Sequence, residues 1–288
     1  MIAVIGATGN TGRAVVGELR QLGEDPVCIV RDMDKARQVL GAGARSVVAE
    51  LSDRPALENA LSGVRRVFLV TGHNPQLAEQ QINALEAARA VGAELFVKAS
   101  SAKVLADPNS DSVVGQGHYA VEEAMKKSGL GWVILRPGLF MQNAFQQADL
   151  IKAEGKMALP FAADLPIAFI DVRDTGALGA RVCLDPDPHV GKELAFTGAA
   201  SSYAEFATVL SEVIGKPVTY IAASFEQAEQ ALKGRGLPDW LVAHLLAVAK
   251  IAADGALSKE VAQPIRDIVG REPLTIRQFV EDHKDMFV

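Results

Sequence analysis

Three glycines near the start of the chain have a spacing that suits phosphate binding. Gly6, Gly9 and Gly12 stand three residues apart, between the apolar run Ile2–Ile5 and a segment with helical periodicity. Glycine permits unusual backbone angles and has no Cβ to hold a pyrophosphate away, and a helix beginning here would point free N–H groups at it. The pattern predicts a dinucleotide site, with a ligand-free glycine turn as the alternative. The predicted contacts in this turn are Gly6, Thr8, Gly9, Asn10, Thr11 and Gly12.

The end of the second predicted strand bears on which dinucleotide binds. An NAD site places an acidic residue about 20 residues past the glycine motif, on the ribose hydroxyls. Here Arg31 follows the strand, and with help from Lys35 it would pair with the 2′-phosphate of NADP. Asp32 comes next and could take the acidic role instead, and Arg31 could be a solvated strand end. The sequence favours NADP(H) over NAD(H).

Other candidate cofactor contacts follow the ends of later predicted strands. They are Thr71, Gly72, Ala99, Ser100, Ser101, Pro137 and Gly138. Ser100 and Ser101 could instead be ordinary turn residues, and the neighbouring Arg136 could be a structural ion pair. If the strands are parallel, these residues lie along one edge of the sheet with the glycine turn.

His118 and Ser100 are the candidate catalytic residues. His118 stands near the start of the helix predicted over Gln116–Ser128, on the side of the sheet where the nicotinamide should sit. An imidazole titrates near neutral pH and can donate a hydrogen bond or a proton to a developing oxyanion. The alternative is a surface or hydrogen-bonding histidine at a helix start.

These residues need a framework of strands to bring them together. Short apolar runs alternate with helical patterns, at Ile2–Ile5, Pro26–Val30, Ser46–Ala49, Arg66–Val70, Glu94–Ala99 and Trp132–Arg136. Such alternation predicts βαβ units and an α/β fold with a doubly wound parallel sheet of the Rossmann type. In that fold ligands bind beyond the carboxyl ends of the strands.

The alternation of short apolar runs and helical patterns ends near residue 140. We predict a dinucleotide-binding domain over residues 1–140 and a smaller, mostly helical substrate lobe over 141–288, with parts around 170–197 that could return to the sheet. The stretch "MALPFAADLPIAF" is predicted to be a loop. Aromatic and apolar residues belong to a core by default, but some could line a pocket for a flat acceptor. The pocket candidates are Phe140, Met141, Asn143, Phe161 and Trp240.

Composition narrows the possible partners. The chain has 288 residues, 49% of them apolar, and a formal charge of −6, which argues against nucleic acid or an anionic membrane as the main partner. We identify no membrane-spanning run, no signal peptide and no metal-binding cluster. The two cysteines, Cys28 and Cys183, lie in apolar runs, which predicts free thiols in the cytoplasm. A monomer or a homodimer is expected.

Several motifs in order resemble one known family. They are "VIGATGNTGRAVV", "FVKASS", "HYAVEEAMKKSGLGWVILRPGLFMQN", "FIDVRDTG" and "LSKEVAQPIRDIVGREPLTIRQFVEDH". Together they resemble the NmrA-like, atypical short-chain dehydrogenase/reductase family over nearly the whole chain. The resemblance implies a Rossmann domain with a small substrate lobe. Similar proteins include NADPH-dependent quinone and triphenylmethane dye reductases, and non-catalytic redox sensors.

One departure from the family pattern matters for the chemistry. The usual Tyr-x-x-x-Lys signature is absent, because Tyr119 is followed four residues later by Glu123. His118 and Glu122 instead resemble the His-x-x-x-Glu of the quinone- and dye-reducing members. The resemblance therefore implies an NADPH-dependent oxidoreductase that passes hydride to a small quinone-like or conjugated aromatic acceptor. An NADP(H)-binding sensor is the alternative, and a nucleotide-sugar epimerase is disfavoured.

Overall fold

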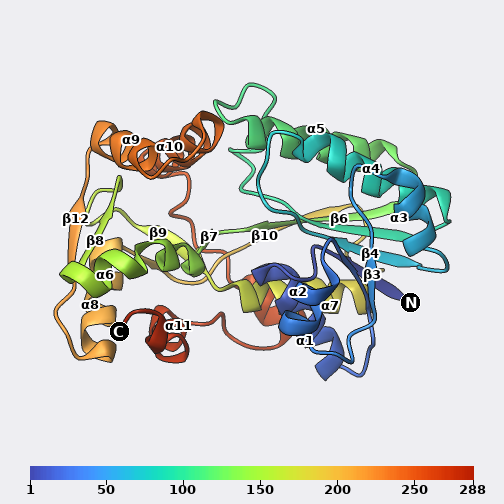
Figure 1. Ribbon diagram of the computed structural model, residues 1–288, viewed down its shortest axis with the longest axis horizontal. Helices are drawn as coiled ribbons and strands as arrows, with labels where there is room; N and C mark the ends of the chain where they lie inside the picture. The colour runs from blue at the N-terminus through green and yellow to red at the C-terminus, as the bar shows by residue number, and fades with distance from the viewer.

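The computed structural model describes residues 1–288 and is built around a sheet of seven parallel strands (Figure 1). The strands are β1 (Ile2–Ile5), β2 (Val27–Val30), β3 (Ser46–Val48), β4 (Arg66–Leu69), β5 (Leu95–Ala99), β6 (Gly131–Pro137) and β10 (Lys192–Phe196). Their order across the sheet is β10–β6–β5–β4–β1–β2–β3. The predicted doubly wound α/β fold is confirmed.

Helices cover both faces of this sheet (Figure 1). One face carries α1 (Asn10–Gln21), α2 (Met33–Leu40) and α7 (Val172–Leu184), and the other carries α3 (Arg54–Ala60), α4 (Leu77–Ala90) and α5 (Val113–Lys127). Successive side chains of a strand point to opposite faces. In β5, Val97 therefore enters the core under α1 and α7, whereas Phe96 enters the core under α4 and α5. Lys98, two residues after Phe96, lies on the α5 side.

The second lobe has its own core and two small sheets. Its helical elements are η1 (Met141–Gln147), α6 (Ala148–Glu154), α8 (Tyr203–Ile214), α9 (Phe225–Gly234), α10 (Asp239–Ala253) and α11 (Ile276–Asp282). One small sheet joins β7 (Leu139–Phe140), β9 (Ile167–Ile170) and β11 (Ala200–Ser201), and the other joins β8 (Lys156–Leu159) and β12 (Thr219–Ala222). Aromatic rings dominate the core, with Tyr203 between Phe161, Phe169 and Phe206.

The strands of the second lobe correct one prediction. The stretch "MALPFAADLPIAF" is predicted to be a loop, but it contains most of β8 and most of β9. Thr219 pairs with Lys156, and Ala200 pairs with Ala168. Each of these strands is fixed by a partner remote in the sequence, which no local pattern reveals.

Two segments late in the chain return to the main sheet. Helix α7 packs closely along α1, and β10 pairs with β6 in parallel at the edge of the sheet. Arg66 on β4 donates from Nη1 to the carbonyl oxygens of Cys183 and Leu184, at 2.9 and 3.0 Å. The π-helix η2 (Ile265–Val269) also packs on α7. The layer that covers the main sheet therefore includes residues that precede α8–α10 in the chain and residues that follow them.

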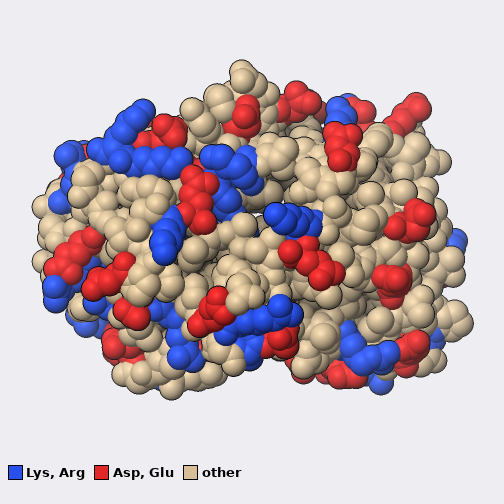
Figure 2. Space-filling model, turned by 180° about the vertical axis from the view of Figure 1, so that it is seen from behind, with Lys and Arg blue, Asp and Glu red and all other residues tan.

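Charged residues are mixed in sign over the surface. Figure 2 shows acidic and basic side chains interleaved over one face, with a hollow near the middle of that face. No helix combines the length and the apolar character needed to cross a lipid bilayer.

Candidate functional site

The loop between β1 and α1 uses its three glycines in two different ways. Gly6 has a φ of +80°, and a Cβ there would lie 1.9 Å from the carbonyl oxygen of Val70. A Cβ on Gly12 would lie 2.1 Å from the carbonyl oxygen of Gly6. A Cβ on Gly9 would have its nearest neighbour at 3.4 Å, an ordinary contact. Packing within the protein therefore requires Gly6 and Gly12, whereas the space beside Gly9 is free for a ligand.

The start of α1 fits an anionic ligand. Gly9 is the N-cap residue, and no side chain caps the helix. The N–H groups of Asn10, Thr11 and Gly12 have no acceptor within the protein. Unpaired donors at a helix N-terminus, without an acidic side chain in the first turn, form a site suited to a pyrophosphate. Thr8 is half-buried and Asn10 is exposed beside them.

The residues after β2 bear on whether Arg31 or Asp32 contacts the ribose end of the dinucleotide. Oδ1 of Asp32 accepts from the N–H groups of Asp34 and Lys35 at 2.9 and 3.0 Å, so this carboxylate caps α2. Arg31 and Lys35 are both exposed, and neither forms an ion pair. Arg37 on the same helix pairs with Asp34. Two cations near the glycine loop thus remain free to meet a phosphate.

The sheet order brings the other strand ends to the same edge. β1 lies beside β4, β4 beside β5 and β5 beside β6, so the residues after these strands form a row that starts at the glycine loop. Thr71 accepts a hydrogen bond from Nε2 of Gln81 at 2.7 Å, and Gly72 is exposed. Ala99 is 7% exposed, and the hydroxyl of Ser101 is buried without a hydrogen-bond partner.

Pro137 and Gly138 lie where the main sheet passes into the second lobe. Pro137 is buried at the end of β6, opposite Phe196 of β10. A Cβ on Gly138 would lie 2.4 Å from the carbonyl oxygen of Ala168. Gly138 is therefore required by contact between two parts of the chain, and its contact with a nicotinamide stays a prediction.

A buried ionic cluster lies between β5, α5 and β6. Glu122 is 0% exposed and binds Arg136 through both oxygens, at 3.0 Å to Nη1 and 2.6 Å to Nη2. Arg136 also donates from Nε to Glu193 of β10 at 2.8 Å and from Nη1 to the carbonyl oxygen of Ser101. Lys126 pairs with Glu193 at 3.0 Å, toward the surface. Arg136 thus forms the structural ion pair considered from the sequence, and it also ties three elements together.

Lys98 and His118 meet at the inner end of this cluster. Nζ of Lys98 lies 2.6 Å from Nδ1 of His118 and donates to Oγ of Ser100 at 3.0 Å. Ser100 in turn donates to Oε1 of Glu122 at 2.5 Å. Both predicted catalytic residues therefore contact one buried amine. Lys98 is not among the residues predicted from the sequence, although a lysine inside the apolar strand "ELFVKA" was the available signal.

The surroundings of His118 differ from those expected at a helix start. The predicted helix began at Gln116, but α5 begins at Val113 with Ser112 as its cap, so His118 lies in the second turn and is 5% exposed. Burial, reinforced by Lys98, lowers the pKa of His118 well below its usual value. The imidazole is therefore neutral at pH 7 and acts as a hydrogen-bond donor rather than as a cation.

Two further histidines, neither of them predicted from the sequence, lie near His118. The His73 ring, which follows β4, lies 6.3 Å from that of His118 and 4.5 Å from that of His244, measured between centroids. Nδ1 of His244 on α10 is 2.8 Å from Oγ of Ser112. α10 is thereby attached to the start of α5, beside the site. No group of three His, Cys, Asp or Glu residues is arranged to hold a metal ion.

Tyr119 is only half-buried, and its hydroxyl makes no hydrogen bond within the protein. It follows His118 on α5, so its side chain points about 100° around the helix axis from that of His118. We keep the prediction that Tyr119 is a packing residue.

The predicted pocket residues differ in their surroundings. Met141 and Phe161 are 2% and 7% exposed and belong to the core of the second lobe. Phe140 and Trp240 are partly buried and pack against opposite faces of the main sheet. Asn143 is half-buried on η1. Contact of these residues with an acceptor stays a prediction.

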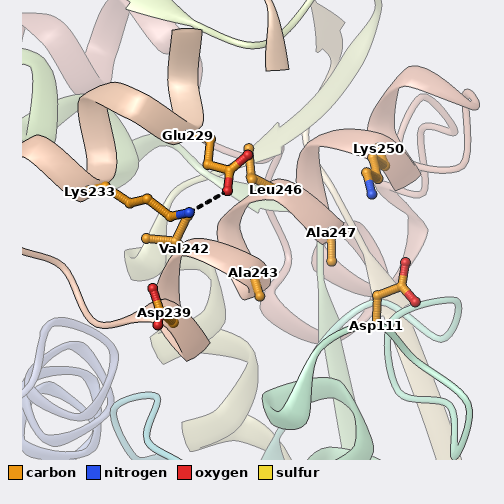
Figure 3. A pocket seen from close by; sticks show the side chains of 9 residues that line it. All are labelled: Asp111, Glu229, Lys233, Asp239, Val242, Ala243, Leu246, Ala247 and Lys250. Atoms are coloured by element: carbon orange, nitrogen blue, oxygen red, sulfur yellow. Dashed lines mark hydrogen bonds and ion pairs between the residues drawn. The ribbon is translucent and has the colours of Figure 1, made fainter. Parts of the chain in front are cut away.

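A groove of about 500 Å³ lies along α10, outside the row of strand ends (Figure 3). Glu229 and Lys233 of α9 form an ion pair on one side of it, and Asp111 and Lys250 lie on the other. Four of its nine lining residues are apolar and five are charged. None of the predicted pocket residues lines it.

Comparison with known proteins agrees with this geometry. The model of the NmrA-like family matches residues 1–280. The NAD(P)H azoreductase of Xenophilus azovorans is 31% identical over 288 residues, covering 100% of this chain and 99% of that protein. Quinone oxidoreductase 2 of Escherichia coli is 30% identical over 97% of each chain. The crystal structure of an NADPH-dependent quinone oxidoreductase from Escherichia coli, complexed with NADPH, aligns with a TM-score of 0.86 and 30% identity over 99% of this chain and 100% of that one.

Proposed function

The chain belongs to the NmrA-like family, and we propose that it is an NADPH-dependent oxidoreductase that reduces a small quinone or aromatic dye. One structural observation carries this proposal. The free N–H groups at the start of α1 and the buried Lys98–His118 pair lie on the same edge of the sheet, separated by the single strand β4. A dinucleotide bound along this edge would extend from the first feature to the second.

The residues of the glycine loop and of α2 account for binding. The free N–H groups of α1 would hold the pyrophosphate, with Gly9 allowing the backbone to approach it. Arg31 and Lys35 would hold the 2′-phosphate, which NAD lacks. Preference for NADP(H) over NAD(H) is therefore part of the proposal.

When bound, the reduced dinucleotide supplies a hydride to the acceptor. His118 would donate a hydrogen bond from Nε2 to the oxygen or nitrogen of the acceptor that becomes negative. Nε2 is suited to this role because it makes no hydrogen bond within the protein and reaches the surface, while Nδ1 faces Lys98. Ser100 fixes Lys98 and Glu122 in place by hydrogen bonds to both.

Steady-state turnover with NADPH and a panel of quinones and dyes tests the proposal. A positioned donor contributes about 10²–10⁴ in rate, and quinones need little help, so His118→Ala should lower turnover at least tenfold, the low end of that range. NADPH affinity should change little. His118→Gln, which keeps a donor, should retain more activity than the alanine variant.

His189→Ala is the matched control, because His189 precedes β10 and so lies at the amino ends of the strands, whereas the proposed site lies at their carboxyl ends. Its turnover should equal that of the wild type. If His118→Ala lowers only the melting temperature, His118 is a structural residue. If the wild type binds NADPH but reduces no acceptor, the protein is the sensor considered above and not a reductase.

The acceptor is proposed to be a small molecule, and the protein a cytoplasmic monomer or homodimer. Both cysteines are buried and unpaired, and burial raises the pKa of Cys28 to about 11 and that of Cys183 to about 12. Thiols of this kind do not need an oxidising compartment.

A further inference from the structure

The surroundings of Lys98 are unusual for a lysine. Its side chain is 0% exposed, and no carboxylate oxygen lies within ion-pair distance of Nζ. Both oxygens of Glu122 are already engaged, one by Arg136 alone and the other by Arg136 and Ser100. The near neighbours of Nζ are Nδ1 of His118 at 2.6 Å and Oγ of Ser100 at 3.0 Å, with the carbonyl oxygen of Ala99 at 3.5 Å.

Such an environment disfavours the charged amine. Burial lowers the pKa of Lys98 to about 7, because Arg136 adds to the effect of burial and Glu122 opposes it only in part. Besides these two residues, the ionisable groups that face Lys98 are His118 on α5 and His73 after β4. Glu193 on β10 acts only through Arg136. At neutral pH, Lys98 can therefore both hold and release a proton.

His118 connects this amine to the edge of the sheet. A protonated Lys98 donates to Nδ1, so the imidazole proton lies on Nε2. Nε2 has no partner within the protein and reaches the surface. The imidazole thus has a proton source on one nitrogen and a free donor on the other.

We propose that Lys98 supplies the proton that reduction requires, and that it does so through His118. Once hydride has reached the acceptor, the acceptor anion takes the proton from Nε2 while Nδ1 takes one from Lys98. The protonated amine, neutral imidazole and anion become neutral amine, neutral imidazole in its other tautomer and neutral reduced acceptor, so atoms and charge balance. The pair is reset by the reverse transfer: Nε2 takes a proton from water, and Nδ1 returns its proton to Lys98, which is itself buried. Lys98 acts through His118 and does not itself contact the acceptor.

This inference rests on the proposed function, but the pair can also be observed without turnover. In protein labelled with ¹³C at lysine Cε and ¹⁵N in histidine, NMR should show one lysine titrating near pH 7, absent from Lys98→Met. The same variant should change the tautomer of His118. An ordinary lysine pKa for Lys98, or an unchanged His118 spectrum in Lys98→Met, would overturn the inference even in an active enzyme.

The pH dependence of turnover tests the role of the pair. Wild-type kcat should fall as pH rises above about 7, because Lys98 loses its proton. Lys98→Met should lower kcat at least tenfold at pH 6.5 and abolish this dependence, with NADPH affinity unchanged. Lys98→Arg keeps the charge but does not release a proton at these pH values, so it should not restore activity.

Lys126→Met is the matched control, because Lys126 pairs with Glu193 at the outer end of the cluster. Its pH profile should match that of the wild type. Full activity in Lys98→Arg would show that Lys98 contributes charge and not a proton, and would overturn the inference. If NMR shows the titrating Lys98–His118 pair but no acceptor is reduced, the proposed function fails. The role of Lys98 in reduction then fails with it, and only the lowered pKa of Lys98 is supported.

Discussion

The glycine loop after β1 and the ionic cluster beneath the end of β5 are built in opposite ways. The loop consists of backbone from seven consecutive residues, and its donors are main-chain N–H groups. The cluster consists of side chains from β5, α5, β6 and β10, and its charged donors Lys98 and Arg136 are buried. The loop therefore depends on the absence of side chains, whereas the cluster depends on every partner being present.

The largest effect should come from breaking the cluster at Glu122. Glu122→Gln leaves Arg136 buried with only Glu193 as a carboxylate partner, and losing one member of a buried ion pair costs about 3–5 kcal/mol. We expect the free energy of unfolding to fall by about that amount in urea. The neighbouring Glu123→Gln breaks only surface pairs with Lys126 and Lys127 and should cost about 0–1 kcal/mol. Equal losses in the two variants would remove the distinction between the cluster and the surface.

The loop should respond in binding and not in stability. Gly9 has φ −79° and ψ 167°, an extended conformation that valine adopts readily, so Gly9→Val should fold normally. Its side chain would occupy the space left for the pyrophosphate and should lower NADPH affinity at least a hundredfold, about 2.7 kcal/mol. Gly17→Val on the same helix, also free of contacts, should bind NADPH as the wild type does. Normal NADPH titration of Gly9→Val would contradict the cofactor site.

A smaller effect is expected at Arg31. A hydrogen bond to a charged group contributes about 1.5–3 kcal/mol, which is roughly a tenfold to hundredfold change in affinity. Arg31→Ala should weaken NADPH binding by that factor and leave NADH binding nearly unchanged, as measured by fluorescence titration. Arg37→Ala, on the helix α2 that follows Arg31 but paired with Asp34, should change neither. Equal losses for both cofactors in Arg31→Ala would mean that Arg31 is structural.

The smallest effect is a pH dependence of stability. The folded pKa of Lys98 is lowered from 10.5 to about 7, so between these values the unfolded chain holds one more proton. The free energy of unfolding should therefore rise with pH in this window, by at most about 1.4 kcal/mol per pH unit. Urea titrations at pH 7.5 and 8.5 should show this slope in the wild type and a smaller one in Lys98→Met. A slope of the same size in the wild type and in Lys98→Met would contradict the lowered pKa of Lys98.

The loop could be predicted from the sequence because its chemistry is local. Three glycines at fixed spacing, a buried strand before them and a helix after them all fall within the first 21 residues. Six strands of the parallel sheet followed for the same reason, since each is a short apolar run beside a helical pattern, whereas β10 was covered only by the expectation that parts around 170–197 could return to the sheet. Strands of the second lobe were missed, because β8 is paired with a strand remote in the sequence, Lys156 lying opposite Thr219 of β12.

The cluster could be predicted only in part. His118, Ser100 and Glu122 were considered, but His118 and Ser100 meet at Lys98, which no spacing rule connects to α5, and Glu122 is reached through Ser100. His73 and His244 come from two further segments and approach only in the fold. Side chains contributed by several elements leave no periodic signal, so three-dimensional proximity had to identify them.

The late return of α7 and β10 has a consequence for the synthesis of this protein. When residue 140 has been added, β6 is still an open edge and α1 still lacks the helix that covers it. Residue Phe196 follows roughly 3–11 s later at about 5–20 residues per second. During that interval an unpaired edge strand and an apolar helix face are exposed, which favours aggregation. A chain truncated near residue 140 would remain in that condition permanently, so any shortened version that is to bind the dinucleotide must extend at least through β10.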